Sequence, residues 1–145
     1  MSFKFALQKV LEVKDFEKTD AERAYTESVE EFEGVATQLY ELLKKKEELV
    51  EETEKKLIRG LAISSIQLNE QNISFLQTEI NKLQLSTQKA RQNMNEKEKF
   101  LLFKTVDLKK YEKMKKIKQA QYLENEKREE LKFLDEVSIQ QFVRR

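Results

Sequence analysis

The chain has 145 residues, and its 28 Lys and Arg nearly balance its 27 Asp and Glu, which leaves a formal net charge of +1. It contains no cysteine and no histidine, so disulfides, thiolate nucleophiles, imidazole bases and histidine metal ligands are excluded. Two glycines, no proline and abundant Glu, Lys, Leu and Gln are typical of long helices and coiled coils. We therefore expect an all-α chain that is not an enzyme and needs no cofactor or metal.

Two further expectations concern catalysis and the membrane. Paired carboxylates are common, but on exposed helices they keep too much solvent for their pKa values to be tuned to acid–base work. No apolar run approaches the roughly 20 residues of a membrane span, and no signal-peptide core follows Met1. We expect a cytoplasmic protein without direct membrane insertion.

The first part of the chain predicts one long helix over about residues 3–58. Leu7 and Leu11 fall on one helical face, with Phe3 and Val10 beside them. From Tyr25 onward, steps of four and three residues alternate, which indicates a coiled-coil seam. One row contains Tyr25, Phe32, Leu39, Lys46 and Thr53, and the other contains Val29, Ala36, Leu43, Val50 and Leu57. Gly34 falls outside both rows, and we expect the helix to tolerate it at a cost of about 1 kcal/mol.

The stretch from Ile58 to Ser65 interrupts this pattern and contains Gly60. Glycine reaches a positive φ cheaply and is the usual residue just past a helix end. We predict a bend over about residues 59–65, with the two helices forming an antiparallel coiled-coil hairpin in a single domain, 1–145.

The second helix is predicted over about residues 66–141. Its rows contain Ile73, Ile80, Thr87, Met94, Leu101 and Leu108 on one side, and Leu76, Leu83, Ala90, Lys97, Lys104 and Tyr111 on the other. If the chain turns near residue 61, residue i faces about residue 123 − i. Val50 then meets Ile73 and Leu43 meets Ile80, an apolar match that favours a hairpin over a continuous rod.

The same register leaves the C-terminal end of the second helix without an opposing arm. Phe3 would face about residue 120, so the overhang runs from about residue 121 to the C-terminus. It still carries Leu123, Leu131, Phe133, Leu134, Val137, Ile139 and Phe142. An isolated helix with so many apolar residues needs a partner to pack on.

A lysine-rich run from Lys109 to Lys118 leaves two interpretations open. It is either a solvated helix face, balanced by the glutamates from Glu124 to Glu130, or a contact for an acidic protein surface. Nucleic acid is the less favoured partner, because the charge of the whole chain is near zero. Tyr40 lies off both rows and is expected to be an exposed aromatic.

Both ends of the chain resemble a known family. The opening Phe3-x-Phe5-x-Leu7-x-x-Val10-Leu11 and the closing Tyr122-Leu123-Glu124, Lys127-Arg128-Glu129-Glu130 and Leu134-Asp135-Glu136 are similar to the termini of the FliJ proteins of bacterial flagellar type III export. The length, the bend near Gly60 and the long second helix agree with that family, so the resemblance spans the whole chain.

The resemblance implies a function that residue spacing alone does not indicate. FliJ proteins are similar to the shaft of rotary ATPases: their paired termini enter the central hole of a hexameric export ATPase and promote its assembly and activity. They also engage an export-gate membrane protein and handle export chaperones. By this resemblance the protein is a monomer when free, binds no nucleic acid, and is cytoplasmic and peripherally associated with the inner side of the membrane at the export apparatus.

The resemblance also suggests two sets of contact residues. We expect residues at the two termini to contact the ATPase: Phe3, Phe5, Leu7, Phe133, Asp135, Glu136 and Phe142. For the export gate, Gln38, Leu42 and Leu76 match the family in identity, whereas Lys45, Leu49 and Asn72 align with positions that are aromatic in the family. Leu76 lies on the predicted seam, so a plain core role stays open for it. Leu42 and Leu49 lie just off the seam and are expected to form an exposed apolar patch.

Three other functions fit the pattern. The equivalent stalk of a virulence injectisome is close to the flagellar one. A prefoldin-like holdase also uses coiled-coil arms with apolar tips, but prefoldins carry β-hairpins at the bend, and the stretch from Leu61 to Ile66 is too short for them. A homodimeric rod would cover its overhang with a second copy, and sedimentation would separate it from a free monomer.

Overall fold

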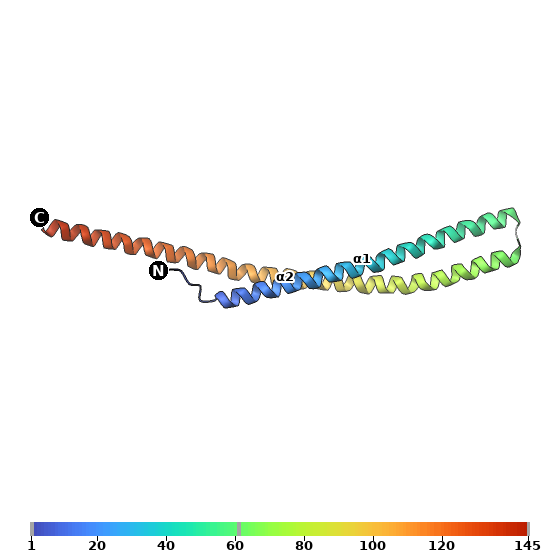
Figure 1. Ribbon diagram of the computed structural model, residues 1–145, viewed down its shortest axis with the longest axis horizontal. Coiled ribbons are helices and arrows are strands. Elements are labelled where there is room, and N and C mark those ends of the chain that lie inside the picture. The colour runs from blue at the N-terminus through green and yellow to red at the C-terminus, as the bar shows by residue number, and fades with distance from the viewer. Residues whose placement is uncertain (1, 61, 145) are drawn as a thin grey trace. The chain divides into compact units, whose positions relative to one another are not determined.

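The computed structural model describes residues 2–60 and 62–144, and within these ranges the chain forms two long α-helices and no strand. Helix α1 spans Gln8–Arg59 and helix α2 spans Ile63–Arg144. The helices pack against each other as a hairpin (Figure 1), which confirms the predicted all-α fold. Leu61 belongs to the predicted bend but lies outside the described residues.

The bend depends on Gly60, as predicted. Gly60 has a φ of 70°, a left-handed conformation that an L side chain resists. Its N–H donates to the Leu57 carbonyl over 3.3 Å, and Ser65 and Ile66 donate to the Ala62 carbonyl at the start of α2. Gly34 lies within α1, where an added Cβ would meet nothing within 4 Å. The helix therefore tolerates it, as expected.

The start of α1 differs from the prediction of a helix from about residue 3. Residues 2–5 have no regular structure, residues 6–7 form a turn, and the helix begins at Gln8. Phe3 instead places its ring 5.6 Å, centroid to centroid, from the ring of Tyr122. Helix ends gain little stability by themselves, so an irregular segment that half-buries Phe3 on α2 replaces the first turn of the predicted helix.

The described structure divides into two units, each containing part of both helices. We call Ala21–Leu101 the hairpin unit, because it contains the bend. We call Met1–Asp20 together with Leu102–Arg145 the terminal unit. The two units are considered separately below.

Contacts across the hairpin unit fix its register. The Lys46 ammonium donates to the side-chain oxygen of Gln77, and the Arg91 guanidinium lies 5.4 Å from the centroid of the Phe32 ring. In both pairs the two residue numbers total 123, so the predicted register is confirmed. Antiparallel packing therefore follows directly from the apolar pattern of the two arms.

Three of the four predicted seam rows are confirmed by burial. The fourth is confirmed at Val29, Ala36 and Val50, which are half-buried, and is wrong at its other two positions. Both rows of α2 and the row of α1 through Phe32 are buried or half-buried. In the other row of α1, Leu43 and Leu57 are 40% and 58% exposed. The residues one position earlier are covered along the whole row: Ser28, Val35, Leu42, Leu49 and Lys56. Ser28 and Lys56 make that row partly polar, so the apolar pattern of the sequence favours the neighbouring row.

Polar side chains occupy several seam positions in the hairpin unit. The hydroxyls of Ser28, Thr53 and Thr87 donate to backbone carbonyls of their own helices over 2.6–2.8 Å. Asn69 is 6% exposed, and its side-chain nitrogen has no hydrogen-bond partner among the described residues. An unsatisfied buried amide costs roughly 1–3 kcal/mol, so the seam is weakened near the bend.

Candidate functional site: two terminal segments and a hairpin face

Ion pairs tie α1 to α2 in the terminal unit. The Lys14 ammonium lies 3.0 Å from an Asp107 carboxylate oxygen, and the Lys104 ammonium lies 3.0 Å from Glu17. The hydrogen bond to Asp107 raises the pKa of Lys14, and the hydrogen bond from Lys104 lowers the pKa of Glu17. The four side chains are partly covered, with 18–34% of their surface exposed, so the pairs fix how the two helices align and add modestly to stability.

The N-terminal segment covers α2 just before the overhang begins. Residues 3–7 and the segment of α2 from Met114 to Asn125 line a hollow of about 390 Å³. Phe3 and Phe5 are half-buried there, while Leu7 is 37% exposed. The hydrogen bond between Tyr122 and Glu126 raises the pKa of the Tyr122 phenol. The N-terminal residues expected to contact an ATPase therefore pack on α2.

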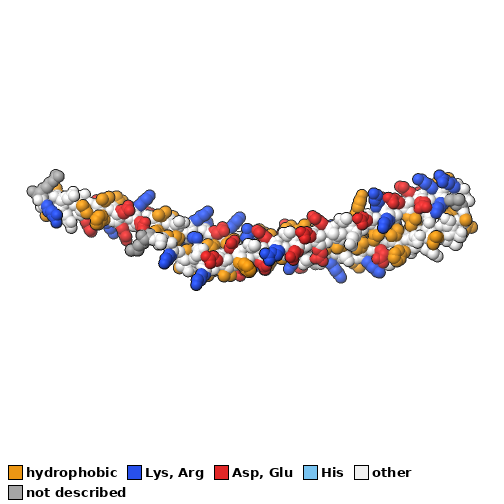
Figure 2. All heavy atoms as spheres, in the orientation of Figure 1, with side chains coloured by type: hydrophobic (Ala, Val, Ile, Leu, Met, Phe, Trp, Pro, Cys, Tyr) orange, Lys and Arg blue, Asp and Glu red, His pale blue; other side chains and the backbone are white. Residues whose placement is uncertain are grey.

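Beyond this contact, α2 continues as a single exposed helix. From residue 127 to 144 the described residues are exposed, apart from half-buried Val137. Phe133 and Phe142 are 65% and 80% exposed, and Figure 2 shows hydrophobic and charged side chains interspersed at this end of α2. The predicted unpaired overhang is confirmed for the described residues. We use the name overhang for residues 127–144.

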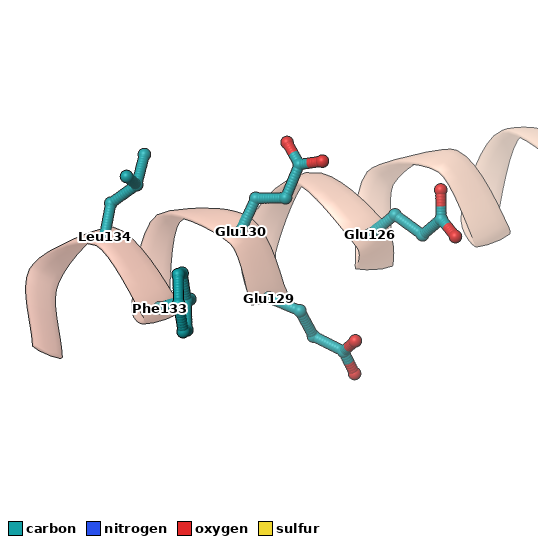
Figure 3. A pocket seen from close by; sticks show the side chains of 5 residues that line it. All are labelled: Glu126, Glu129, Glu130, Phe133 and Leu134. Atoms are coloured by element: carbon teal, nitrogen blue, oxygen red, sulfur yellow. The ribbon is translucent and has the colours of Figure 1, made fainter. Parts of the chain in front are cut away.

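Acidic side chains and then apolar ones follow each other at the base of the overhang. Glu126, Glu129, Glu130, Phe133 and Leu134 line a shallow hollow on α2. In Figure 3, Glu130 and Leu134 point to one side of the helix, whereas Glu129 and Phe133 point to the other. This surface combines negative charge with apolar area, which suits a partner that offers both cations and apolar side chains.

The expected contact residues of the overhang are not gathered on one face. Phe133 and Phe142 are nine residues apart, which places them about 180° apart around a helix of 3.6 residues per turn. Leu134 lies about 100° from Phe133 and Ile139 about 240°, and both are exposed. Asp135 and Glu136 point in two other directions from the same turns of the helix, and both are exposed. Apolar residues therefore point in several directions around the overhang, interspersed with charged ones, and no single apolar stripe is formed.

The expected export-gate residues lie on one side of the hairpin unit, but their exposure differs from the prediction. Gln38, Lys45 and Asn72 are exposed. The three leucines are half-buried because they face the partner helix: Leu42, Leu49 and Leu76. The prediction that Leu42 and Leu49 form an exposed patch is wrong, since the true seam row of α1 runs through them.

Other apolar residues are exposed in the hairpin unit. Leu68 and Phe75 are 57% and 66% exposed. They are seven residues apart on α2, with Asn72 between them, so the three share one face. Tyr40 is 65% exposed, as predicted. The seven-residue spacing of Leu68 and Phe75 outside both seam rows was the available sequence signal for this patch.

Neither a metal site nor a membrane span is found in the part of the chain that the structure describes. Across residues 2–60 and 62–144, no group of three or more acidic, histidine or cysteine side chains is arranged to hold a metal ion. Neither helix, over its described residues, is long and apolar enough to cross a membrane.

Comparison with known proteins gives two matches that cover almost the whole chain. A family model described as the flagellar FliJ protein matches residues 3–145. The chain is also 37% identical over 143 residues to the flagellar FliJ protein of Bacillus subtilis (strain 168), with 99% of this chain and 97% of that protein covered. No solved structure matches this chain significantly.

Proposed function

This chain belongs to the FliJ family of flagellar proteins, and from that premise we propose that it is the stalk of the flagellar export ATPase. The family assignment makes it a flagellar export-related protein. In the proposed function, the paired termini enter the central hole of the hexameric ATPase and promote its assembly and activity. The protein is then a cytoplasmic monomer when free and is recruited to the inner side of the cell membrane at the export apparatus.

The distribution of apolar residues around the overhang carries this proposal. A second helix packed on the overhang would cover one side and leave either Phe133 or Phe142 in water, because the two lie on opposite sides. A ring covers every side at once. The exposed apolar residues in four or more directions therefore support an encircling partner over a second copy of the chain.

Charge supports the same arrangement. Glu129, Glu130, Asp135 and Glu136 are exposed on the overhang. Cations lining a ring would attract these carboxylates, accelerate association and fix the rotational position of the helix. Next to the base of the overhang, Phe3 packs on Tyr122, so the N-terminal segment would enter the ring together with α2.

The hairpin unit supports a second contact in the same machine. We infer that it engages the export-gate membrane protein and export chaperones through the side that carries Gln38, Lys45 and Asn72, which are exposed. Leu42, Leu49 and Leu76 would act mainly by holding that side in place. The exposed pair Leu68 and Phe75 would supply the apolar area that a stable contact needs.

The decisive experiment measures ATP hydrolysis by the cognate export ATPase, titrated with this protein, together with light scattering for ring assembly. We expect the whole chain to stimulate hydrolysis and hexamer formation. A chain ending at Ala120 should keep its hairpin, as judged by circular dichroism, but lose the stimulation. Stimulation by the truncated chain equal to that of the whole chain would contradict ring insertion.

A single-residue series sharpens the experiment. Phe133→Ser and Phe142→Ser should each reduce stimulation, because they lie on opposite sides of the overhang and a ring contacts both. Phe16→Ser is the matched control, since Phe16 is 72% exposed on α1, outside the overhang. A loss confined to one of the two overhang variants would indicate a one-sided partner instead of a ring.

A further inference from the structure

One face of α2 is left unused by the proposed stalk function. Over residues 102–117, the side of α2 that points away from α1 carries only lysine and apolar residues. The apolar members are Leu102, Phe103, Val106 and Ile117, between 46% and 64% exposed. The basic members are Lys109, Lys110, Lys113 and Lys116, all exposed. We call these eight residues the lysine face.

Positive charge exceeds negative charge on and beside this face. Of the two acids of the segment, Asp107 pairs with Lys14 of α1 over 3.0 Å. Glu112 lies at the edge of the face, three residues after Lys109 and four before Lys116, and is the one carboxylate of the segment beside the four lysines. Within the described residues of the terminal unit, none of the four lysines of the face forms an ion pair. Four ammonium groups and four apolar side chains therefore face solvent together.

From this combination we propose that the lysine face adsorbs to the surface of an anionic phospholipid bilayer. Four to eight basic residues on one side of an amphipathic helix are attracted to anionic headgroups, by about 1 kcal/mol for each residue. Phe103, Leu102 and Val106 are of the kind that enters the boundary between headgroups and acyl chains, while lysine stems reach back to the phosphates. The helix lies on the membrane and does not cross it.

The choice of lysine favours lipid over a protein partner. Protein interfaces are enriched in arginine and depleted in lysine, because the planar guanidinium binds carboxylates with two hydrogen bonds and is more weakly hydrated. The lysine face has four lysines and no arginine. A strongly hydrated ammonium suits a diffuse, mobile layer of phosphates. Sixteen residues of helix also present a line of about 24 Å, which a flat surface can contact along its whole length.

The test measures binding of the full-length protein alone to vesicles by sedimentation, so its result does not depend on the proposed ATPase contact. Vesicles of phosphatidylglycerol mixed with phosphatidylcholine are compared with vesicles of phosphatidylcholine alone, at low and at physiological ionic strength. We expect binding only to the anionic vesicles, with an affinity that falls as salt rises. The double variant Lys109→Glu with Lys113→Glu should lose binding on the order of 100-fold, and Phe103→Ser about tenfold.

Matched controls separate the contribution of the lysine face from the general effect of charged and apolar residues elsewhere on the chain. Lys44→Glu with Lys55→Glu makes the same change of charge at exposed positions of α1, and Phe16→Ser removes an exposed phenylalanine of α1. Both controls should bind like the unmodified protein. Equal binding to neutral vesicles, equal losses in the controls, or no binding at low salt would overturn the proposal. Binding of an acidic amphipathic peptide to this face, without vesicle binding, would assign the face to a protein partner and would also overturn it.

Discussion

The paired part of α2 and its overhang contain similar shares of apolar residues, but α1 packs against the paired part and not against the overhang. Ile80, in the hairpin unit, is 1% exposed, whereas Ile139, in the overhang, is 63% exposed. In the paired part, α1 covers one apolar stripe, although other apolar residues such as Leu68 and Phe103 stay exposed. In the overhang, apolar residues point in several directions among charged ones. A stripe specifies one helical neighbour. The overhang has no such stripe, so the two parts of α2 present different kinds of surface.

The largest expected difference between the two regions concerns core truncation. Ile80→Ala should lower the free energy of unfolding by roughly 2–5 kcal/mol, because it removes a fully buried side chain and leaves a cavity. Phe133→Ala in the overhang should change it by less than about 0.5 kcal/mol. Urea unfolding monitored by circular dichroism measures both. A comparable loss in the two variants would show that the overhang is packed within the free protein.

A smaller effect should come from the buried amide of the seam. Asn69→Leu removes the side-chain nitrogen that has no hydrogen-bond partner among the described residues. It should raise the free energy of unfolding by roughly 1–3 kcal/mol. The gain in stability should be accompanied by a loss of register specificity, since a single polar seam residue can select one alignment. Asn72→Leu, at an exposed position three residues later, is the control and should have little effect on the unfolding midpoint.

The two glycines should respond in opposite directions. Gly60→Ala forces a side chain into the left-handed region at a φ of 70° and should destabilise the hairpin by about 1–2 kcal/mol. Gly34→Ala adds a methyl group in open space within α1 and should stabilise it by up to about 1 kcal/mol. Thermal unfolding of the two variants should shift to either side of the unmodified protein. Shifts of the same sign would contradict the assigned roles.

The smallest expected effect is a dependence of stability on pH. Glu17 has a lowered pKa because Lys104 donates a hydrogen bond to it, so its stabilising contribution is present above the pKa of the unfolded state and is lost as the pH falls through the folded pKa. Lys14 has a raised pKa, so its contribution is present below the unfolded pKa and disappears as the pH rises through the folded pKa. Unfolding of Lys104→Gln, measured across the acidic range, should lack most of the Glu17 contribution. A profile identical to that of the unmodified protein would show that the pair contributes nothing.

Sequence alone determined the architecture and most of the register. The repeat through Ile73 and Ile80 specifies a stripe on α2, Gly60 specifies the bend, and the apolar match between the arms specifies residue 77 opposite residue 46. These features are readable because helical periodicity and the conformational freedom of glycine are local properties of the chain. The overhang was also predictable, because it follows from the position of the bend and the length of the chain.

Only the tertiary structure decided which of two adjacent rows of α1 faces α2. Leu42 and Leu43 are equally apolar. Which of them is buried depends on the position in which α2 packs against a stripe of α1 that is wider than a single seam. That choice moved Leu42 and Leu49 into the interface and left Leu43 and Leu57 exposed. Likewise, the packing of Phe3 on Tyr122 ended the helix early, because a contact between residues far apart in sequence outweighs the weak local preference at a helix end.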